Sequence, residues 1–208
     1  MLKDIKKNRI VAIISESNDL RSDFNKKIIK KYKIKELKIS SEKISDIFNS
    51  YKDLDILFEL AKNIGLKKDV FNRNINMISE SELHRINLLY QLLQDDEFLL
   101  IDDLFDILDN KNRTKLFKYV LKLKKYNNKT IFISTSNINN VYEIVDDIIY
   151  VNENDIIYDN KYDIYEKNDI KEKPEIINFV NMMKEKYPHI SYKDSINELI
   201  KELYRELR

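Results

Sequence analysis

Short apolar runs bounded by polar residues predict a set of buried β-strands. The clearest runs are rich in Ile, Val, Leu and Phe and are shorter than a typical helix. These runs lie at residues 9–15, 97–102 and 129–134. Residues 148–151 and 156–158 are close enough along the chain to form a hairpin, and we interpret residues 34–39 as a further short strand.

Between these runs, apolar residues recur at helical spacing. The predicted helices cover residues 20–31, 44–64 in two pieces, 80–94, 111–126 and 137–145. Gly65 follows the second of these stretches and is expected to act as its C-terminal cap. Strands that alternate with helices are typical of an α/β domain with a mostly parallel sheet flanked by helices.

The last part of the chain has a different pattern. After about Tyr162 only helices are predicted, one after Pro174 and another after Ser195, which forms a capping-box pattern with Glu198. The final helix has an apolar stripe made of Ile196, Leu199, Ile200, Leu203, Tyr204 and Leu207. Either the chain's own domain or a dimer or partner contact has to cover this stripe. We therefore divide the chain into a domain at residues 1–160, with a helical region at about 42–95, and a C-terminal helical extension at 161–208.

Composition and charge restrict the classes of function. The 208 residues are 43% hydrophobic and 35% charged, with a net charge of +1, so we expect a folded protein that binds no nucleic acid through bulk charge. The sequence has no apolar run of membrane-spanning length and no signal-peptide pattern, so we expect the chain to be cytoplasmic. We expect it to reach the inner face of the cell membrane only by binding a partner protein. With no Cys and two His, we expect neither a zinc site nor haem.

Polar residues follow the predicted strands where nucleotide-binding proteins hold their ligand. A strand, a polar turn and a helix at residues 9–31 form the arrangement that can place a helix N-terminus under a phosphate. Asp102 and Asp103 come at the end of a buried strand, where the magnesium and attacking water of a nucleotide are commonly managed. Ser136 follows the next strand along the chain.

Several motifs between residues 78 and 159 occur in a characteristic order. Ile78-Ser79-Glu80-Ser81-Glu82-Leu83-His84-Arg85 aligns without gaps with the signature Leu-Ser-Gly-Gly-Glu/Gln-x-Gln-Arg. Residues 98–103 align with a Walker B strand, 104–109 with the segment holding a D-loop, and 130–136 with a strand ending in a switch histidine. Together these motifs resemble the second half of an ATP-binding cassette (ABC) transporter ATPase domain, which has a P-loop NTPase fold.

The resemblance implies a set of site residues. It places a catalytic base at Asp103, a switch residue at Ser136 and a magnesium site at Ser22 and Asp102. The nucleotide contacts that it implies are at Ser15, Asn18, Arg21, Ser22, Ser79 and Asp109.

The Walker A position departs most from the family. The family reads Gly-x-x-Gly-x-Gly-Lys-Ser/Thr-Ser/Thr, whereas this chain reads Ser15-Glu16-Ser17-Asn18-Asp19-Leu20-Arg21-Ser22-Asp23. All three glycines of the family motif are absent from this chain. In the family, these glycines allow backbone N–H groups to close on phosphate. Glu16, Asp19 and Asp23 also bring negative charge to a site for anions. We therefore expect Mg–ATP to bind weakly or not at all.

The catalytic positions are altered as well. Asp103 replaces a glutamate and is one methylene shorter, Ser136 replaces the switch histidine, and Glu80 replaces a signature glycine. We therefore interpret the chain as a degenerate ABC-type ATP-binding subunit, a catalytically impaired or inactive structural or regulatory partner in a transporter complex. The implied partner is an intact ABC ATPase, a permease subunit or a second copy of this chain. Two alternatives stay open: a divergent ATPase that still couples hydrolysis to transport, and a dimeric interaction module without nucleotide chemistry.

Overall fold

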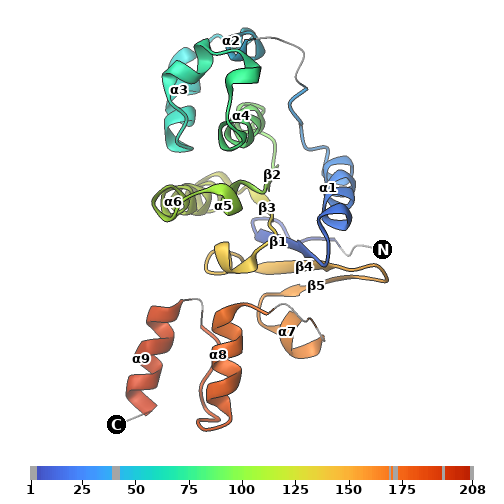
Figure 1. Cartoon of the computed structure of the whole chain (residues 1–208), viewed down its shortest axis with the longest axis vertical. Helices are drawn as coiled ribbons and strands as arrows, with labels where there is room; N and C mark the ends of the chain where they lie inside the picture. The colour runs from blue at the N-terminus through green and yellow to red at the C-terminus, as the bar shows by residue number, and fades with distance from the viewer. Residues whose placement is uncertain (1–3, 39–42, 169, 171–172, 194, 207–208) are drawn as a thin grey trace.

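A five-stranded sheet forms the centre of the molecule (Figure 1). The computed structural model describes residues 4–38, 43–168, 170, 173–193 and 195–206. The strands have the spatial order β2-β3-β1-β4-β5. Their bounds are β1 Ile10–Ser15, β2 Phe98–Asp102, β3 Thr130–Ser134, β4 Asp147–Val151 and β5 Ile156–Asn160. β1 pairs in parallel with β3 and β4, β2 pairs in parallel with β3, and β5 closes the edge as the antiparallel partner of β4.

Helices cover both faces of this sheet and extend beyond it. The α-helices are α1 Asn18–Tyr32, α2 Ile44–Ile47, α3 Leu54–Asn63, α4 Glu80–Leu93, α5 Leu104–Ile107, α6 Asn110–Asn127, α7 Asp163–Lys167, α8 Glu175–Lys184 and α9 Ile196–Glu206. The 3₁₀ helices are η1 Lys68–Asn72, η2 Ile75–Met77 and η3 Ile138–Asn140. In the described residues, no helix is long and apolar enough to cross a bilayer.

The alternation of side chains along β1 explains why the sheet is buried on both faces. Ile10, Ala12 and Ile14 face the larger core, to which α4 and α6 contribute apolar side chains. Val11 and Ile13 face the opposite side, where α1 supplies residues such as Phe24 and Ile28. Side chains of a strand point alternately to opposite faces, so a strand covered on both sides reads as a continuous apolar run. The predicted α/β fold with a mostly parallel sheet is therefore confirmed.

A helical region made of α2, α3 and α4 lies beyond one side of the sheet, and α8 and α9 lie on the other (Figure 1). The helical region has its own aromatic contacts, in which the Phe71 ring meets the rings of Phe48 and Phe58. Ile164, Ile170 and Ile177 belong to the main core, so the C-terminal part begins as a continuation of the domain. The predicted division at residue 160 stays a prediction.

Three secondary-structure predictions need correction. Helix α1 begins at Asn18 rather than at Leu20, because Ser17 accepts a hydrogen bond from the N–H of Leu20 and acts as the N-cap. Residues 34–38 form no strand, and Ile39 lies outside the described residues. The predicted helix at 137–145 is limited to η3, and turns follow it.

Gly65 ends helix α3 in a Schellman motif. Its N–H donates to the Lys62 carbonyl at 3.1 Å, and the N–H of Leu66 donates to the Ala61 carbonyl at 2.8 Å. Gly65 has φ +80°, and a Cβ added there would come no closer than 3.9 Å to the Arg85 side chain. The only glycine of the chain thus lies where the backbone needs a left-handed residue. There is room for a larger side chain at this position, so backbone conformation and not steric contact favours glycine.

We expect Gly65→Ala to lower the free energy of unfolding by about 1–2 kcal/mol, the usual cost of left-handed geometry for a residue with a Cβ. Urea denaturation measures this change. Gly65→Asn is the matched control and should lose less, because asparagine tolerates this conformation better. Equal stability of Gly65→Ala and the parent chain would contradict the requirement for a left-handed residue.

Candidate functional site

The carboxyl ends of three parallel strands bring polar residues together at one edge of the sheet. In the register of the strands, Asp102 at the end of β2 pairs with Ser134 at the end of β3, and Ser134 pairs with Ile13 of β1. The turns after β1, β2 and β3 therefore meet at this edge, which is the usual ligand-binding position in an open α/β sheet. We call this group of side chains the edge cluster: Asn18, Arg21, Asn25, Asp102, Asp103, Asp106, Ser134, Thr135, Ser136 and Asn140.

Arg21 is the only cation in the edge cluster. Helix α1 places it toward the sheet, where the residue is 5% exposed. Its guanidinium lies 2.6 Å from Oδ1 of Asp103 and 3.9 Å from Oδ2 of Asp106, and it donates a hydrogen bond of 3.0 Å to Oδ1 of Asn18. A guanidinium this deeply buried needs compensating charge, and here two carboxylates of the chain supply it.

Asp103 is held in an unusual backbone conformation. It has φ +50°, which few residues other than glycine adopt, although aspartate is one of the more tolerant. Its N–H donates to the Ser134 carbonyl at 3.0 Å, and its own carbonyl accepts from the N–H of Asp106 at 3.0 Å. Burial raises the pKa of the Asp103 carboxyl, while the positive charge of Arg21 opposes that rise. The carboxylate of Asp103 thus depends on Arg21 for its charge balance.

Asp102 is bound by an amide rather than by a hydroxyl of helix α1. The side-chain amide of Asn25 donates to Oδ1 of Asp102 at 2.9 Å and to the hydroxyl of Ser134 at 2.8 Å. Asn25 is 4% exposed, and it lies one helical turn after Arg21 on the buried side of α1. Ser22, the predicted second magnesium ligand, is exposed. An amide N–H₂ group therefore lies beside Asp102, where a magnesium site would need oxygen ligands.

Asp106 ties the end of β3 to α5. Its carboxylate accepts hydrogen bonds from the Thr135 hydroxyl, from both the N–H and the hydroxyl of Ser136, and from the Asn140 side-chain amide. These four bonds have lengths of 2.5 to 2.9 Å. Ser136, at the position of the switch histidine, is thereby directed at a carboxylate of its own chain.

The turn between β1 and α1 has only two residues, Glu16 and Ser17. The N–H of Glu16 donates to the Val151 carbonyl, and its carboxylate accepts from the Tyr150 hydroxyl at 2.8 Å. The N–H of Ser17 donates to Oγ of Ser15, and Oγ of Ser17 accepts from Leu20. Residues 15–23 are all described, and none has a positive φ. A phosphate loop needs several N–H groups that converge on one point, whereas the N–H groups of Glu16 and Ser17 in this turn already have acceptors within the chain.

Ser79 and Asp109 act as helix caps outside the edge cluster. Ser79 is the N-cap of α4 in a full capping box with Glu82. Asp109 is the N-cap of α6, and its carboxylate accepts from the N–H and the side-chain amide of Asn112 at 2.8 Å each. Hydrogen bonds from backbone N–H groups of this turn lower the pKa of the Asp109 carboxyl. These residues have local bonding partners that explain their identity.

The structure brings together Asn18, Arg21, Asp102, Asp103 and Ser136 of the predicted site, and Ser15 is the last residue of β1, next to the turn that leads into α1. Ser22, Ser79 and Asp109 lie apart from this cluster, so their predicted roles rest on the resemblance alone. Sequence reasoning missed Asn25, Asp106, Thr135 and Asn140. Asn25 could have been noticed as a polar residue on the apolar side of α1, since it falls next to Phe24 and three residues before Ile28.

We expect Asp106→Asn to lower the free energy of unfolding by about 2 kcal/mol, because an amide N–H₂ would face groups that are themselves donors. Chemical denaturation measures this loss. Asp23→Asn, at an exposed carboxylate of α1, is the matched control and should leave stability nearly unchanged. Retention of full stability by Asp106→Asn would contradict the hydrogen-bond network described for this carboxylate.

Comparison with known proteins agrees with this fold and motif order. No protein-family model matches the chain. The chain is 27% identical over 146 residues to the lacticin-481/lactococcin-DR transport/processing ATP-binding protein lcnDR3 of Lactococcus lactis, a match that covers 70% of this chain and 20% of the relative. It is 28% identical over 91 residues to the energy-coupling factor transporter ATP-binding protein EcfA2 of Staphylococcus saprophyticus, covering 44% of this chain and 32% of the relative. The chain thus spans a third or less of the length of these relatives.

Solved structures show the same architecture. A putative metal-chelate type ABC transporter in an inward-facing conformation aligns with a TM-score of 0.60 and 14% identity, over 78% of this chain and 76% of that one. CbiO1 from Clostridium perfringens, part of the ABC transporter complex cbiONQ, aligns with a TM-score of 0.57 and 16% identity, over 90% and 88% of the two chains. The chain is therefore homologous to ABC transporter ATP-binding proteins and has the α/β fold of their P-loop ATPase cassettes.

Proposed function

We propose that the chain is a catalytically impaired or inactive ABC-type subunit with a structural or regulatory role in a transporter complex. The observation that carries the proposal is the ion pair of 2.6 Å between Arg21 and Asp103. In the family resemblance, Arg21 stands at the Walker A lysine and Asp103 at the catalytic base. The cation for a phosphate and the carboxylate for a water molecule therefore bind each other.

The charges around Arg21 support this proposal. A nucleotide phosphate would have to replace Asp103 at the guanidinium and would then lie among the carboxylates of the edge cluster. A repulsion between two unit charges ~4 Å apart is worth ~4 kcal/mol at an effective dielectric constant of ~20. That is about half of the ~8 kcal/mol that a micromolar dissociation constant represents. Charge alone would thus weaken nucleotide binding strongly, even if the turn after β1 could open.

The remaining positions support impaired catalysis. Asp103 is fixed through both its backbone and its side chain, which leaves it poorly placed to orient a water molecule. Ser136 has no imidazole, and its hydroxyl and N–H are both bonded to Asp106. Groups that must act together in catalysis lose most of their effect when one is misplaced by ~1 Å.

The relatives suggest where such a subunit acts. One is a transport/processing ATP-binding protein, one belongs to an energy-coupling factor transporter, and one is part of an ABC transporter complex. We infer that this chain binds an intact ABC ATPase, a permease subunit or a second copy of itself, and that it reaches the cytoplasmic side of the membrane through that partner. In this role it contributes its fold and surface to the assembly.

We expect no thermal stabilisation of the purified chain by millimolar Mg–ATP or Mg–ADP, because the guanidinium of Arg21 is already paired with carboxylates of the edge cluster. A ligand at 100 times its dissociation constant adds about 2.7 kcal/mol, which raises the melting temperature of a chain of this size by roughly 5–10 °C. Differential scanning fluorimetry detects a shift of that size. An intact ABC cassette measured in parallel shows that the nucleotide stocks are active.

A rise in melting temperature that disappears in Asp102→Ala would contradict the proposal. It would instead favour the divergent ATPase, in which Arg21, Ser22 and Asp102 hold Mg–ATP and Asp103 acts as the base. Phosphate release at a rate above the blank, lost in Asp103→Ala, would complete that alternative.

A further inference from the structure

The longest α-helix in the described part of the chain carries positive charges and no negative ones. Helix α6 contains seven basic residues and neither aspartate nor glutamate. Every other α-helix that the structure describes contains at least one acidic residue. Because the whole chain has 37 basic and 36 acidic residues, this imbalance belongs to α6 and does not follow from the composition.

The fold uses two of these cations. The Arg113 guanidinium donates hydrogen bonds of 3.0 Å to two backbone carbonyls between residues 105 and 108, and the Lys124 ammonium lies 2.7 Å from the Asp146 carboxylate. The other five ammonium groups have no hydrogen bond or ion pair with a residue that the structure describes, although Lys125 lies 5.1 Å from the centre of the Tyr126 ring. We call these five side chains the lysine row: Lys111, Lys115, Lys118, Lys122 and Lys125.

The lysine row occupies one face of α6. Its members have the spacing i, i+4, i+7, i+11, i+14, which places them within an arc of about 80° and along about 21 Å of the helix. All five are exposed, and the opposite face is buried through Leu116, Val120 and Leu123. Leu121 and Tyr126, which are 43% and 69% exposed, flank the row on its two sides. Helix α6 lies at the margin of the molecule, between the helical region and α9 (Figure 1), so the row faces outward.

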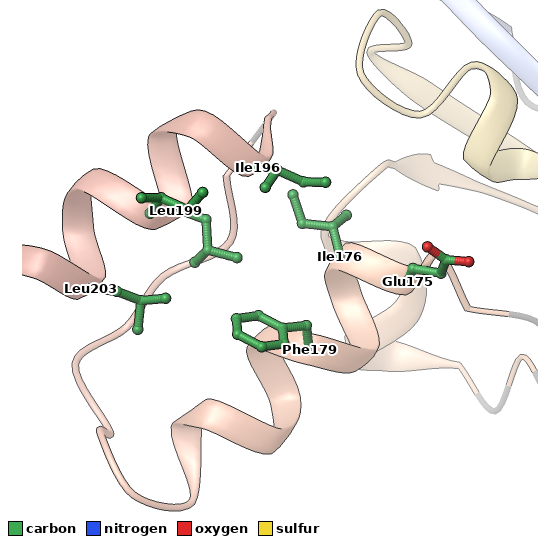
Figure 2. A pocket seen from close by; sticks show the side chains of 7 residues that line it. Glu175, Ile176, Phe179, Ile196, Leu199 and Leu203 are labelled. Carbon is green, nitrogen blue, oxygen red and sulfur yellow. The ribbon is translucent and has the colours of Figure 1, made fainter.

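Helix α9 has a charged face of the ordinary kind. Figure 2 shows Leu199 and Leu203 on the side of α9 that faces α8. The charged side chains of α9 lie on another side, where glutamates and cations share one surface, and the Lys193 ammonium is 3.2 Å from the Glu202 carboxylate. Opposite charges therefore compensate one another on α9, whereas the lysine row has no such partners within its own helix.

The lysine row does not help α6 to fold. Successive members are three or four residues apart, which is the spacing at which like charges on a helix repel one another. Acidic residues of neighbouring elements lie to the two sides of the row: burial and the nearby charge of Glu59 in α3 raise the pKa of Tyr119 to about 12, and Glu143 lies beside Leu121. A face that costs stability and is exposed over its whole length indicates a negatively charged surface outside the chain as its partner.

The side chains of the row favour a lipid surface over a protein or a nucleic acid. All five are lysines, which present a flexible point charge, and none is an arginine, whose planar fork suits a phosphate or carboxylate that is fixed in one position. Protein interfaces are depleted in lysine. Reading of base edges uses Arg, Asn and Gln as well as Lys, and the row contains only Lys. A bilayer of anionic lipids presents mobile negative headgroups over a wide plane, which the full length of the row can meet at once.

We propose that the lysine row binds the surface of a bilayer that contains anionic lipids, with α6 parallel to the bilayer plane. The five ammonium groups meet lipid phosphates, and Leu121 and Tyr126 enter the headgroup layer on either side of them. This contact goes beyond the proposed function, because it uses none of the edge cluster and needs no nucleotide. It also places the chain at a membrane directly, in addition to any contact through a partner protein.

Sedimentation with lipid vesicles tests this proposal on the purified chain. We expect the chain to bind vesicles made of equal parts phosphatidylcholine and phosphatidylglycerol, and to stay in the supernatant with pure phosphatidylcholine. A lysine near an anionic surface contributes about fivefold in affinity, so the triple variant Lys115→Gln, Lys118→Gln and Lys122→Gln should bind on the order of 100-fold more weakly. Salt at ~1 M should release the parent chain, because it shortens the screening length to ~3 Å.

The matched control removes three exposed lysines on either side of α3 and at its end, in the variant Lys52→Gln, Lys62→Gln and Lys67→Gln. This variant changes the net charge by the same amount and should bind the mixed vesicles like the parent chain. Thermal melts should show that both triple variants are folded. The variant in the lysine row should melt no lower than the parent chain, because it loses the repulsion between like charges.

Equal binding to both kinds of vesicle, or binding to neither, would overturn the proposal, as would an equal loss of binding in the two triple variants. Tighter binding of the parent chain to duplex DNA or to polyglutamate than to the mixed vesicles, at the same salt concentration, would also overturn it. The lysine row would then belong to a nucleic acid or to an acidic protein.

Discussion

The ion pair between Arg21 and Asp103 organises the edge of the sheet. It joins α1 to the turn after β2, and it is the reason that a guanidinium can lie 5% exposed beside the strand ends. The Asp106 carboxylate lies 3.9 Å from the same guanidinium and accepts hydrogen bonds from Ser136 and Asn140. The turn after β3 is therefore linked to Arg21 as well. Breaking a buried pair leaves an uncompensated charge, which costs more than the pair itself contributes. In the function that we propose, the carboxylates that disfavour a phosphate at Arg21 are therefore the ones that compensate its buried charge.

In the function that we propose, this arrangement keeps the cassette fold without its nucleotide chemistry. The β-branched run of β1 and the parallel pairing of β1, β2 and β3 need only apolar side chains, and these are retained. A phosphate loop needs glycines, and the sole glycine of the chain, Gly65, serves a helix end far along the sequence. Where the loop would be, a two-residue turn and an N-cap at Ser17 extend helix α1 toward the strand. The edge cluster is thus an internally bonded joint between three strands and two helices.

The sequence predicts the sheet well because its strands are buried on both faces and appear as continuous apolar runs. It predicts Asp102, Asp103 and Ser136 at one edge because parallel strands end together. It does not predict Asn25 or Asp106 as partners, because a hydrogen bond between residues 29 to 77 positions apart leaves no local pattern. Residues 34–38 form no strand, although Ile34 and Leu37 are apolar. These two side chains pack against the cores on the two faces of the sheet without their backbone pairing with a strand.

The most direct measurement is a double-mutant cycle between Arg21 and Asp103. Arg21→Met, Asp103→Asn and the double variant are compared with the parent by urea denaturation, with and without millimolar Mg–ATP. Because Asp103 is partly exposed, the account predicts a coupling free energy of about 1 kcal/mol, unchanged by nucleotide. Additive effects of the two substitutions, or a coupling that disappears when Mg–ATP is added, would show that Arg21 is available to phosphate and would contradict the account.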